Sequence, residues 1–471
     1  MTFYNDDTIA AIATPIGDGG IGIVRISGRE AVAVASRMFQ TTSKIHVDDL
    51  PSHTVHYGYA IDPECKTHID DGLITIFRGP KSYTGEDSVE ISCHGGIVPM
   101  RKVLEAALRS GARLAEPGEF TKRAFMNGRL DLVQAEAVLD IIRARTDEAL
   151  RVARRQLDGV LSEKIRSLRG EMLGIIAHIE ACIDFPEDVE EWQPGRMVGS
   201  IKEAISHVKG LLETADKGKI YREGIQTVIT GSPNVGKSSL LNALLRESRA
   251  IVTPIPGTTR DIIEESLSIG GIPVRAVDTA GVRETDDPIE QIGVQRAKDA
   301  IENADLVIAV VDAEAGFTSE DEKMLKGLAA KKFIVALNKS DLFRQSDAAA
   351  LAARIQSWMR SELNLDIPVL NTAATWNDGI VELEKAIADS IFAGGIPYTD
   401  GPVVSNVRHR RALEEALEGL ERSVQTAQAG MSLDFICIDL RTAIDALGRI
   451  TGETVADDVI DRIFSEFCIG K

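Results

Sequence analysis

The sequence has few cysteines and no long hydrophobic run. Its 471 residues include five cysteines, scattered and odd in number, which fits neither a disulfide framework nor a metal site and predicts a reducing, cytoplasmic environment. No stretch reaches the roughly 18 apolar residues of a membrane span. The first residues, MTFYNDD, have no basic start and no apolar run, so we expect no secretory signal. These absences argue against a secreted or membrane protein.

Positive charge is also scarce. Lys and Arg number 53 against 72 Asp and Glu, a net charge of −19, so the surface as a whole is a poor match for nucleic acid. Residues 101–169 are the exception, with 15 basic and 10 acidic residues. If the protein has a polyanionic partner, we expect it near this segment. The alternative is a charged, solvated helix face.

Hydrophobic patterning divides the chain into parts. A chain of this length predicts about three domains. Residues 1–120 alternate short apolar runs with Gly-rich turns, which predicts a small α+β domain. Apolar residues then recur at helical spacing, and one stripe over residues 150–179 predicts a single helix of about eight turns. Similar amphipathic helices return near the C-terminal end of the sequence.

Between these helical segments lies a different pattern. Near-continuous apolar runs at residues 225–230, 274–277, 306–311 and 333–337 alternate with helical segments. Such runs are typical of a parallel sheet covered on both faces. We therefore predict a multidomain protein in which an α/β domain is inserted into an all-α domain. The predicted boundaries are 1–120 for the N-terminal domain, 121–222 and 392–471 for the two helical parts, and 223–391 for the insert.

A phosphate-binding motif follows the first strand of the insert. Residues 231–238, GSPNVGKS, match GxxxxGK[ST] between an apolar strand and a helix. The glycines let backbone N–H groups surround phosphates, and the helix N-terminus adds its dipole. Lys237 is expected to reach the β- and γ-phosphates, and Ser238 to hold Mg²⁺. A chance match in this context is improbable.

Two further nucleotide motifs follow in the expected order. Asp278–Gly281, DTAG, comes after a strand, so Asp278 is expected to bind Mg²⁺ through water and the Gly281 N–H to sense the γ-phosphate. Between the motifs, Thr258 and Thr259 lie in a Gly/Pro-rich loop suited to order–disorder switching.

The remaining motifs concern the base. Asn338–Asp341, NKSD, ends in a carboxylate that can accept hydrogen bonds from N1–H and the 2-amino group of guanine. Adenine lacks that donor pair, so the motif selects GTP. Thr372–Ala374 occupies the place where a Ser-Ala pair usually contacts the guanine O6, with Ala373 in place of the Ser.

The water-orienting Gln of Ras-like proteins is missing. Its position holds Val282, which cannot hydrogen-bond to water. Either hydrolysis is very slow or another group replaces the Gln, and Glu290 is one candidate. The positive charge could come from Arg260 or Arg283, or from a monovalent cation bound at Asn234. The spacing alone leaves these alternatives open.

The sequence resembles the MnmE (also called TrmE) family of tRNA-modification GTPases along its whole length. The segments that carry the resemblance are DTIAAIATP from Asp7, GGIGIVRISG from Gly19, YTGED from Tyr83, HGG from His94, PGEFTKRAF from Pro117, NGRLDL from Asn127, IPGTTRD from Ile255 and FCIGK from Phe467. The resemblance implies a folate-binding N-terminal domain that forms the homodimer, a discontinuous helical domain and an inserted Ras-like P-loop GTPase domain.

The resemblance also implies how GTP is hydrolysed. In the family, K⁺ activates the reaction. The positions that would hold K⁺ here are Asn234, Thr253, Ile255 and Thr258, while Glu290 would orient the attacking water as a catalytic residue beside Lys237. Ser238 and Thr259 would hold Mg²⁺. The full set of predicted GTP-binding residues is Asn234, Val235, Gly236, Lys237, Ser238, Ser239, Thr253, Thr258, Thr259, Asp278, Thr279, Ala280, Gly281, Asn338, Lys339, Asp341, Thr372, Ala373 and Ala374.

A second site is implied for a one-carbon folate, 5,10-methylenetetrahydrofolate or 5-formyltetrahydrofolate. Arg25, Glu90, Arg129 and Lys471 fall on the pocket positions of the family, which commonly has Lys at position 129. Basic side chains suit the folate glutamate carboxylates, and a carboxylate suits the pterin N–H edge. Cys468 is either a reactive thiol near the folate or an apolar residue that packs the terminal helix.

The implied activity is tRNA modification in the cytoplasm. With a flavin-dependent partner of the MnmG (GidA) type, in a heterotetramer or larger complex, the protein would form 5-carboxymethylaminomethyl or aminomethyl uridine at the tRNA wobble position. The sequence has no GxGxxG Rossmann start, so the FAD is expected on the partner. The alternatives are a ribosome-assembly GTPase of the Era type, for which no KH-like GxxG between helices is present, and a slow nucleotide-gated scaffold.

Overall fold

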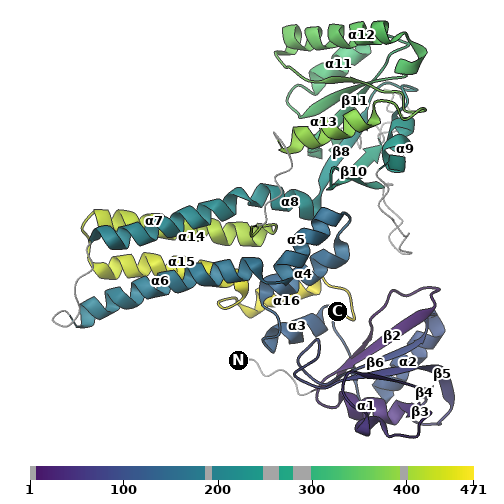
Figure 1. Ribbon diagram of the computed structural model, residues 1–471, viewed down its shortest axis with the longest axis vertical. Coiled ribbons are helices and arrows are strands. Elements are labelled where there is room, and N and C mark those ends of the chain that lie inside the picture. The colour runs from purple at the N-terminus through teal and green to yellow at the C-terminus, as the bar shows by residue number, and fades with distance from the viewer. Residues whose placement is uncertain (1–6, 186–193, 248–264, 279–298, 393–400) are drawn as a thin grey trace. The chain divides into compact units, whose positions relative to one another are not determined.

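The structure is a computed structural model that describes residues 7–185, 194–247, 265–278, 299–392 and 401–471 (Figure 1). The chain divides into two compact units. Unit 1 comprises Met1–Leu139, Leu157–Glu190 and Leu440–Lys471, and unit 2 comprises Asp140–Gln156 and Glu191–Asp439. None of the helices within the described ranges is long and apolar enough to cross a membrane.

Unit 1 contains a seven-stranded sheet in the order β3-β4-β5-β6-β2-β1-β7. All pairs are antiparallel except β1 with β7. The strands are β1 (Ile9–Ile12), β2 (Ile21–Ser27), β3 (Phe39–Thr41), β4 (Thr54–Ile61), β5 (His68–Phe77), β6 (Ser88–His94) and β7 (Arg113–Leu114). Helices α1 (Ala31–Met38) and α2 (Ile97–Arg109), with the short 3₁₀ helix η1 (Val47–Asp49), complete this domain.

One face of this sheet is buried and the other is partly bare. On β2, β5 and β6, alternate residues such as Val24, Ile74 and Ile91 are fully buried in a core with α1 and α2. The residues between them point to the opposite face, where β-strand register places Tyr57 beside Leu73. These two side chains are 48% and 41% exposed. The predicted α+β domain is therefore confirmed, and the exposure of Tyr57 and Leu73 shows that no helix of the described residues covers this part of the second sheet face.

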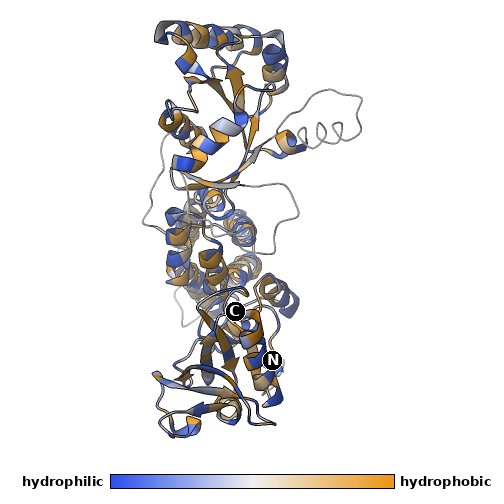
Figure 2. Cartoon of the chain, turned by 90° about the vertical axis from the view of Figure 1, so that its right-hand side faces the viewer, coloured by the Kyte–Doolittle hydropathy of each residue, from blue (hydrophilic) through white to orange (hydrophobic). Residues whose placement is uncertain are grey.

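Helices make up the rest of unit 1 and part of unit 2, and their hydrophobic and hydrophilic residues fall on different sides (Figure 2). They are α3 (Glu119–Met126), α4 (Leu132–Arg143), α5 (Asp147–Leu157), α6 (Val160–Asp184), α7 (Pro194–Glu213), α8 (Ala215–Glu223), α14 (Val407–Gln428), α15 (Leu433–Thr451) and α16 (Asp457–Ser465).

The prediction of one continuous helix over residues 150–179 is wrong. The chain breaks between α5 and α6 at Gly159, whose φ of 89° is left-handed and suits glycine. The carbonyl oxygen of Leu157, which ends α5, accepts a hydrogen bond of 2.9 Å from Gln134 Nε2. The apolar period continues across the break, so periodicity alone did not reveal it.

Unit 2 contains a six-stranded sheet in the order β13-β12-β11-β8-β10-β9. Its strands are β8 (Ile225–Thr230), β9 (Glu265–Ile269), β10 (Ile272–Asp278), β11 (Leu306–Asp312), β12 (Phe333–Asn338) and β13 (Val369–Asn371). The four strands predicted from sequence are mutually parallel, as expected. The edge strands β9, antiparallel to β10, and β13 were not predicted.

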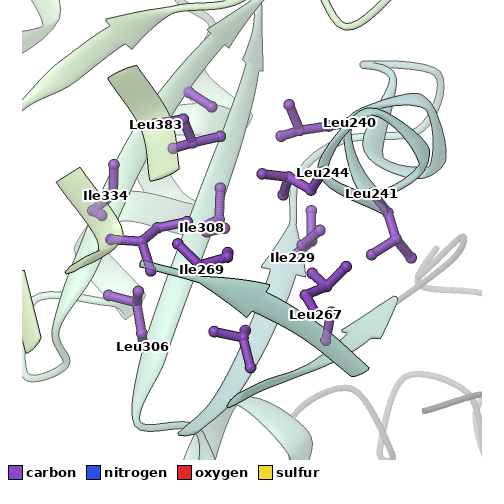
Figure 3. Close-up of a cluster of buried hydrophobic side chains, with 14 of the residues drawn as sticks. Ile229, Leu240, Leu241, Leu244, Leu267, Ile269, Leu306, Ile308, Ile334 and Leu383 are labelled. Carbon is purple, nitrogen blue, oxygen red and sulfur yellow. The ribbon is translucent and has the colours of Figure 1, made fainter. Parts of the chain in front are cut away.

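Both faces of this sheet are covered, which explains its near-continuous apolar strands. Ile229 and Ile308 face α9 (Lys237–Glu247) and α13 (Ile380–Phe392) in the core drawn in Figure 3. On the other face, Val307 packs with residues of α11 (Ser319–Gly327) and α12 (Gln345–Trp358). A 3₁₀ helix η2 (Ser340–Leu342) and a π-helical turn (Met359–Leu363) complete the domain.

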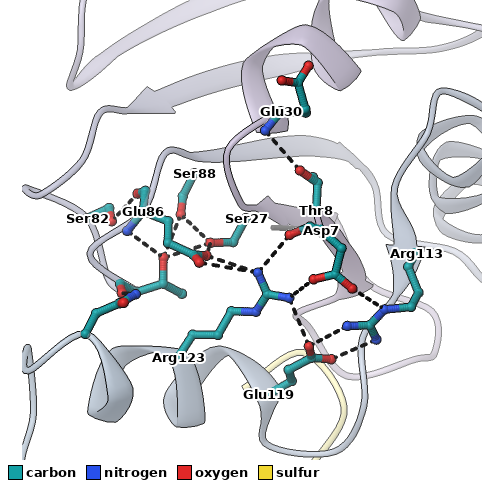
Figure 4. A network of polar contacts seen from close by, with 12 residues as sticks. Asp7, Thr8, Ser27, Glu30, Ser82, Glu86, Ser88, Arg113, Glu119 and Arg123 are labelled. Carbon is teal, nitrogen blue, oxygen red and sulfur yellow. Dashed lines mark hydrogen bonds and ion pairs between the residues drawn. The ribbon is translucent and has the colours of Figure 1, made fainter. Parts of the chain in front are cut away.

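A buried ion network joins α3 to the sheet domain of unit 1 (Figure 4). The Arg123 side chain is 1% exposed and donates to Asp7 at 2.6 Å, to Glu119 at 3.0 Å and to Glu86 at 3.3 Å. Arg113 also pairs with Asp7 and Glu119, both at 2.7 Å. Burial raises the pKa of Glu119 and of Asp7, but hydrogen bonds from the two arginines outweigh it, so both pKa values are lowered. The carboxylates are thus ionised partners of Arg123.

Removal of this guanidinium should destabilise unit 1. We expect Arg123→Met to lower the free energy of unfolding by about 3 kcal/mol at pH 7, because the buried Glu119 and the partly buried Asp7 and Glu86 lose a charged partner. Carboxylates with a lowered pKa stabilise the fold above their unfolded pKa, and this stabilisation disappears as the pH falls through the folded value. The difference between variant and wild type in urea unfolding should therefore shrink below about pH 4.

The matched control is Arg101→Met, because Arg101 on α2 is exposed and its pair with Glu105 spans 3.8 Å. It should change stability by less than about 0.5 kcal/mol. A difference for Arg123→Met that is as large at pH 3 as at pH 7 would contradict the ionic account.

Candidate functional site

The Gly-rich loop between β8 and α9 has the close backbone packing that a phosphate loop needs. Gly231 has a φ of 156°, and a Cβ there would lie 2.4 Å from the Val310 oxygen on β11. Gly236 has a φ of 93°, and a Cβ there would lie 2.3 Å from Asn338 Nδ2. Both positions therefore require glycine. The loop leaves the carboxyl end of a central strand and leads into a helix N-terminus, where parallel sheets bind phosphates.

Two polar side chains of this loop are held in distinct ways. Lys237 is 7% exposed, and its Nζ donates to the carbonyl oxygens of Gly231 at 2.9 Å and Ser232 at 3.0 Å. Its ammonium group therefore lies over the loop that the glycines form. Asn234 is exposed with a φ of 65°, a left-handed conformation that Asn tolerates better than most residues. Its amide is available to a ligand of the loop.

Asn338 connects the candidate phosphate loop with the loops predicted to recognise the base. Its Nδ2 donates to the Val235 oxygen at 2.9 Å, and its Oδ1 accepts from the Ala374 N–H at 3.2 Å and the Thr372 hydroxyl at 3.3 Å. Ser340 adds a link, since its N–H and its hydroxyl both donate to the Thr372 oxygen. The segments 231–238, 338–341 and 372–374 thus meet at one end of the sheet.

The residues predicted to recognise the base lie on two adjoining loops. Asp341 is exposed beyond β12, and Lys339 pairs with Asp312 at 2.5 Å. Ala373, which stands in place of a Ser, is buried and pairs with Asp378 in an isolated bridge. A hydroxyl at position 373 is therefore not needed to hold this loop.

Several predicted residues lie outside the described part of the chain. Asp278 is the last residue of β10, paired in register with Ile229 of β8. The residues that lie outside are Thr253, Ile255, Thr258, Thr259, Thr279, Ala280, Gly281 and Glu290, together with Val282, Arg260 and Arg283. Of the proposed K⁺ and Mg²⁺ ligands, Asn234 and Ser238 are described.

The second predicted site lies on the sheet of unit 1. Arg25 on β2 and Glu90 on β6 are register partners, and their side chains form an ion pair of 2.8 Å. Arg25 Nη1 also donates to the Gly470 oxygen at 3.4 Å. The half-buried Lys471 follows, and burial together with the nearby Arg25 lowers its pKa. Three of the four predicted pocket residues therefore come together from three distant parts of the sequence.

The fourth predicted pocket residue, Arg129, and the predicted thiol Cys468 are placed differently. Arg129 is exposed on the turn after α3, where its N–H donates to the Ala124 oxygen. Cys468 is exposed, so its thiol is not part of an apolar core. Its carbonyl oxygen accepts from the Gly118 N–H at 3.4 Å and thereby holds the chain end against the loop before α3.

Sequence reasoning missed residues around both sites. The rings of Tyr83 and Phe120 lie 5.5 and 5.7 Å from the Arg25 guanidinium, and the Tyr83 hydroxyl bonds to Thr121 at 2.9 Å. Their segments were noted for the resemblance, but nothing in the sequence shows that they meet. Asp312, the partner of Lys339, could have been found as a polar residue at the carboxyl end of a parallel strand.

The fold and the nucleotide motifs define a P-loop GTPase domain inserted in a larger protein. Among solved structures, an Era protein from Aquifex aeolicus is 26% identical, covering 41% of this chain and 66% of that chain, with a TM-score of 0.30. The G domain of FeoB from T. maritima is 26% identical, covering 35% of this chain and 98% of that chain, with a TM-score of 0.26.

Full-length comparison identifies the family. Residues 8–129 match the family described as GTP-binding protein TrmE N-terminus, and residues 132–468 match the MnmE helical domain. The tRNA modification GTPases MnmE of Geobacillus kaustophilus and Geobacillus thermodenitrificans are 49% and 48% identical over 467 residues, covering 99% of each chain. The chain belongs to the MnmE family of tRNA modification GTPases, and the prediction made from its motifs is confirmed. The Era-type alternative is not favoured.

The base specificity can be changed at Asp341. We expect Asp341→Asn to weaken GTP binding about 100-fold, because the guanine N1–H and 2-amino group lose a charged acceptor. The amide can donate to the 2-oxo group of xanthine, so XTP should bind more tightly to the variant than to the wild type. Fluorescence titration with labelled GTP and XTP analogues measures both. Asp378→Asn, an exposed acid of the neighbouring loop, is the matched control, and equal losses in the two variants would contradict the assignment.

Proposed function

We propose that this chain is a K⁺-activated GTPase that forms 5-carboxymethylaminomethyl or aminomethyl uridine at the tRNA wobble position. In this reaction it works with an FAD-containing partner of the MnmG (GidA) type and supplies a one-carbon unit from a folate. The observation that carries the proposal is the match to tRNA modification GTPases over 99% of the chain. The phosphate loop and the base loops that Asn338 joins provide the GTP site.

A bound K⁺ explains how hydrolysis proceeds without a Gln after the DTAG motif. The residue there is Val282, which offers no hydrogen bond to water. A fixed positive charge near the phosphates stabilises the charge that develops in the transition state. Asn234 supports this role because its exposed amide oxygen is a hard ligand within the loop. We assign Thr253, Ile255 and Thr258 as further K⁺ ligands, Ser238 and Thr259 to Mg²⁺, and Glu290 to the water.

GTP turnover should therefore depend on the monovalent cation. We expect the wild type to hydrolyse GTP at least about tenfold faster in KCl than in NaCl. Asn234→Gly removes the amide without strain at a positive φ, and it should abolish the difference while GDP affinity stays within about threefold. Equal slow rates of the wild type in both salts would contradict the cation mechanism and favour a slow scaffold.

The Arg25–Glu90 site has the chemistry of a folate pocket. Its carboxylate can accept from the pterin N–H edge, and Arg25 and Lys471 are cations for the glutamate carboxylates. Tyr83 and Phe120 offer aromatic surface beside Arg25. Asn127, two residues before Arg129, donates its Nδ2 to the oxygen of Thr84, the neighbour of Tyr83, at 2.8 Å. We assign the site to 5,10-methylenetetrahydrofolate or 5-formyltetrahydrofolate.

The partly bare face of the same sheet supports a homodimer. Val55, Tyr57, Leu73 and Ile21 are all more than 40% exposed there. A group of exposed apolar side chains of this kind is typical of a protein interface. A second copy could cover this face. The MnmG-type partner comes from the resemblance, and the cytoplasmic location from the resemblance and the cysteine content; both stay predictions, as does the reactivity of Cys468.

Folate binding tests the second site. We expect Glu90→Gln to weaken 5-formyltetrahydrofolate binding about tenfold or more in calorimetry, because a charge-assisted hydrogen bond is lost. Glu105→Gln on α2, which is exposed, should leave the affinity unchanged. As a separate test of the homodimer, the sedimentation of the wild type is compared with that of Leu73→Asp, which places a charge on the partly bare sheet face. Undiminished binding by Glu90→Gln would place the folate elsewhere.

A further inference from the structure

Unit 2 has a basic surface that the linear sequence does not reveal. Three separated segments meet around residues 403–406. Gln156, at the end of α5, donates to the Val403 oxygen at 3.1 Å and to the Ser405 hydroxyl at 2.9 Å. The backbone of α8 packs so closely at Gly218 that a Cβ there would lie 2.0 Å from the Val404 oxygen. Asn406 then caps α14.

Ion pairs fix the same arrangement. Arg410 in the first turn of α14 pairs with Asp216 of α8 at 2.6 Å. Arg222 at the end of α8 pairs with Asp140 of α4 at 2.8 Å, and both side chains are largely buried. The ends of α4 and α5, helix α8 and the start of α14 therefore pack together in one region of unit 2 (Figure 1).

The charge of this surface differs from that of the chain. Residues 140–156, 215–223 and 407–415 carry 11 Lys or Arg and seven Asp or Glu, in a protein of net charge −19. The exposed basic residues are Arg143, Arg145, Arg151, Arg154, Lys217, Lys219, Arg410 and Arg411. One acid and one base are withdrawn together as the Asp140–Arg222 pair, and the partly buried Glu148 lies against Gly271. In the sequence, the local excess of basic residues lies in residues 101–169. The structure brings the basic residues of α8 and α14 beside part of that segment.

The composition favours phosphate over carboxylate partners. Six of the eight exposed cations are Arg, whose planar fork binds phosphate oxygens with two hydrogen bonds. They are presented by helices whose positions are fixed by the contacts above. A polyanion with regularly spaced phosphates suits such a surface better than an acidic peptide, whose carboxylates are irregular.

We propose that the surface formed by α5, α8 and the first turns of α14 binds the sugar-phosphate backbone of tRNA. The inference rests on tRNA being the substrate in the proposed function. The surface adjoins the entry to the GTPase domain, since α8 leads through Gly224 into β8, and a Cβ at Gly224 would lie 2.4 Å from the Pro273 oxygen on β10. Bound RNA would therefore lie beside the connection through which the GTPase domain is inserted.

Charge reversal at two exposed positions tests the surface. Lys217 and Arg411 are exposed and make no ion pair with another residue that the structure describes. Binding of a fluorescent tRNA transcript to the full-length chain is measured by anisotropy between about 50 and 200 mM KCl. We expect Lys217→Glu/Arg411→Glu to weaken binding at least tenfold at the lowest salt. The salt dependence should also weaken: the magnitude of the slope of log affinity against log salt concentration should decrease by about 2, or about 0.9 per lost phosphate contact.

The matched control is Arg101→Glu/Lys102→Glu, which changes the net charge equally on the exposed face of α2 in unit 1. It should lower tRNA affinity less than threefold and leave the salt slope unchanged. GTP turnover in KCl should be the same in the wild type and both variants, because none of the four residues belongs to the nucleotide site. Thermal unfolding of each variant checks that it folds.

Three results would overturn the inference. The two double variants could weaken tRNA binding equally, which would show a general effect of charge. The surface variant could bind tRNA as well as the wild type does. Finally, polyglutamate at equal charge concentration could displace tRNA from the wild type but fail to bind the surface variant. That result would indicate that the surface binds an acidic protein partner instead. The K⁺ and folate tests are independent of all three, so failure here leaves the proposed function in place.

Discussion

The side chain of Asn338 holds the candidate nucleotide site together. Its amide donates to the backbone of the phosphate loop and accepts from the loop that carries Ala374. Because the same amide lies 2.3 Å from the place where a Cβ of residue 236 would be, the loop can approach only with glycine there. Phosphate recognition, base recognition and the sheet edge are therefore parts of one packed arrangement, and a change in any of them would move the others.

Distant segments of the chain complete each candidate site. Arg25 and Glu90 meet on neighbouring strands, and the end of the sequence reaches them through Gly470. Arg123 ties α3, which carries Phe120, to the sheet domain through buried carboxylates. The basic surface of unit 2 likewise depends on Val403–Asn406, where α5, α8 and α14 meet. Insertion of the GTPase domain separates these segments in sequence while packing keeps them together.

Much of the fold could be predicted because its patterns are local. The strands at 225–230 and 333–337 have apolar runs that both sheet faces bury, and the structure places β8 and β12 there. The break at Gly159 and the edge strands β9 and β13 could not be predicted with equal ease. Helical periodicity runs across the break, and edge strands are short and bury less of their surface. Of the candidate sites, the phosphate and base motifs were readable and Asp312 could have been found from its place after a strand, whereas the meeting of Tyr83 and Phe120 beside Arg25 could not.

The sequence by itself determined the GTPase domain and the family, because consecutive residues make up the phosphate loop and the NKSD motif. A loop that wraps a phosphate needs its glycines and lysine at fixed spacing. Only the tertiary structure decided which residues surround Arg25, that Arg123 is buried among carboxylates, and that basic residues of three segments share one surface. Those relations depend on side-chain packing and hydrogen bonds between segments that lie up to hundreds of residues apart, and no spacing along the chain encodes them.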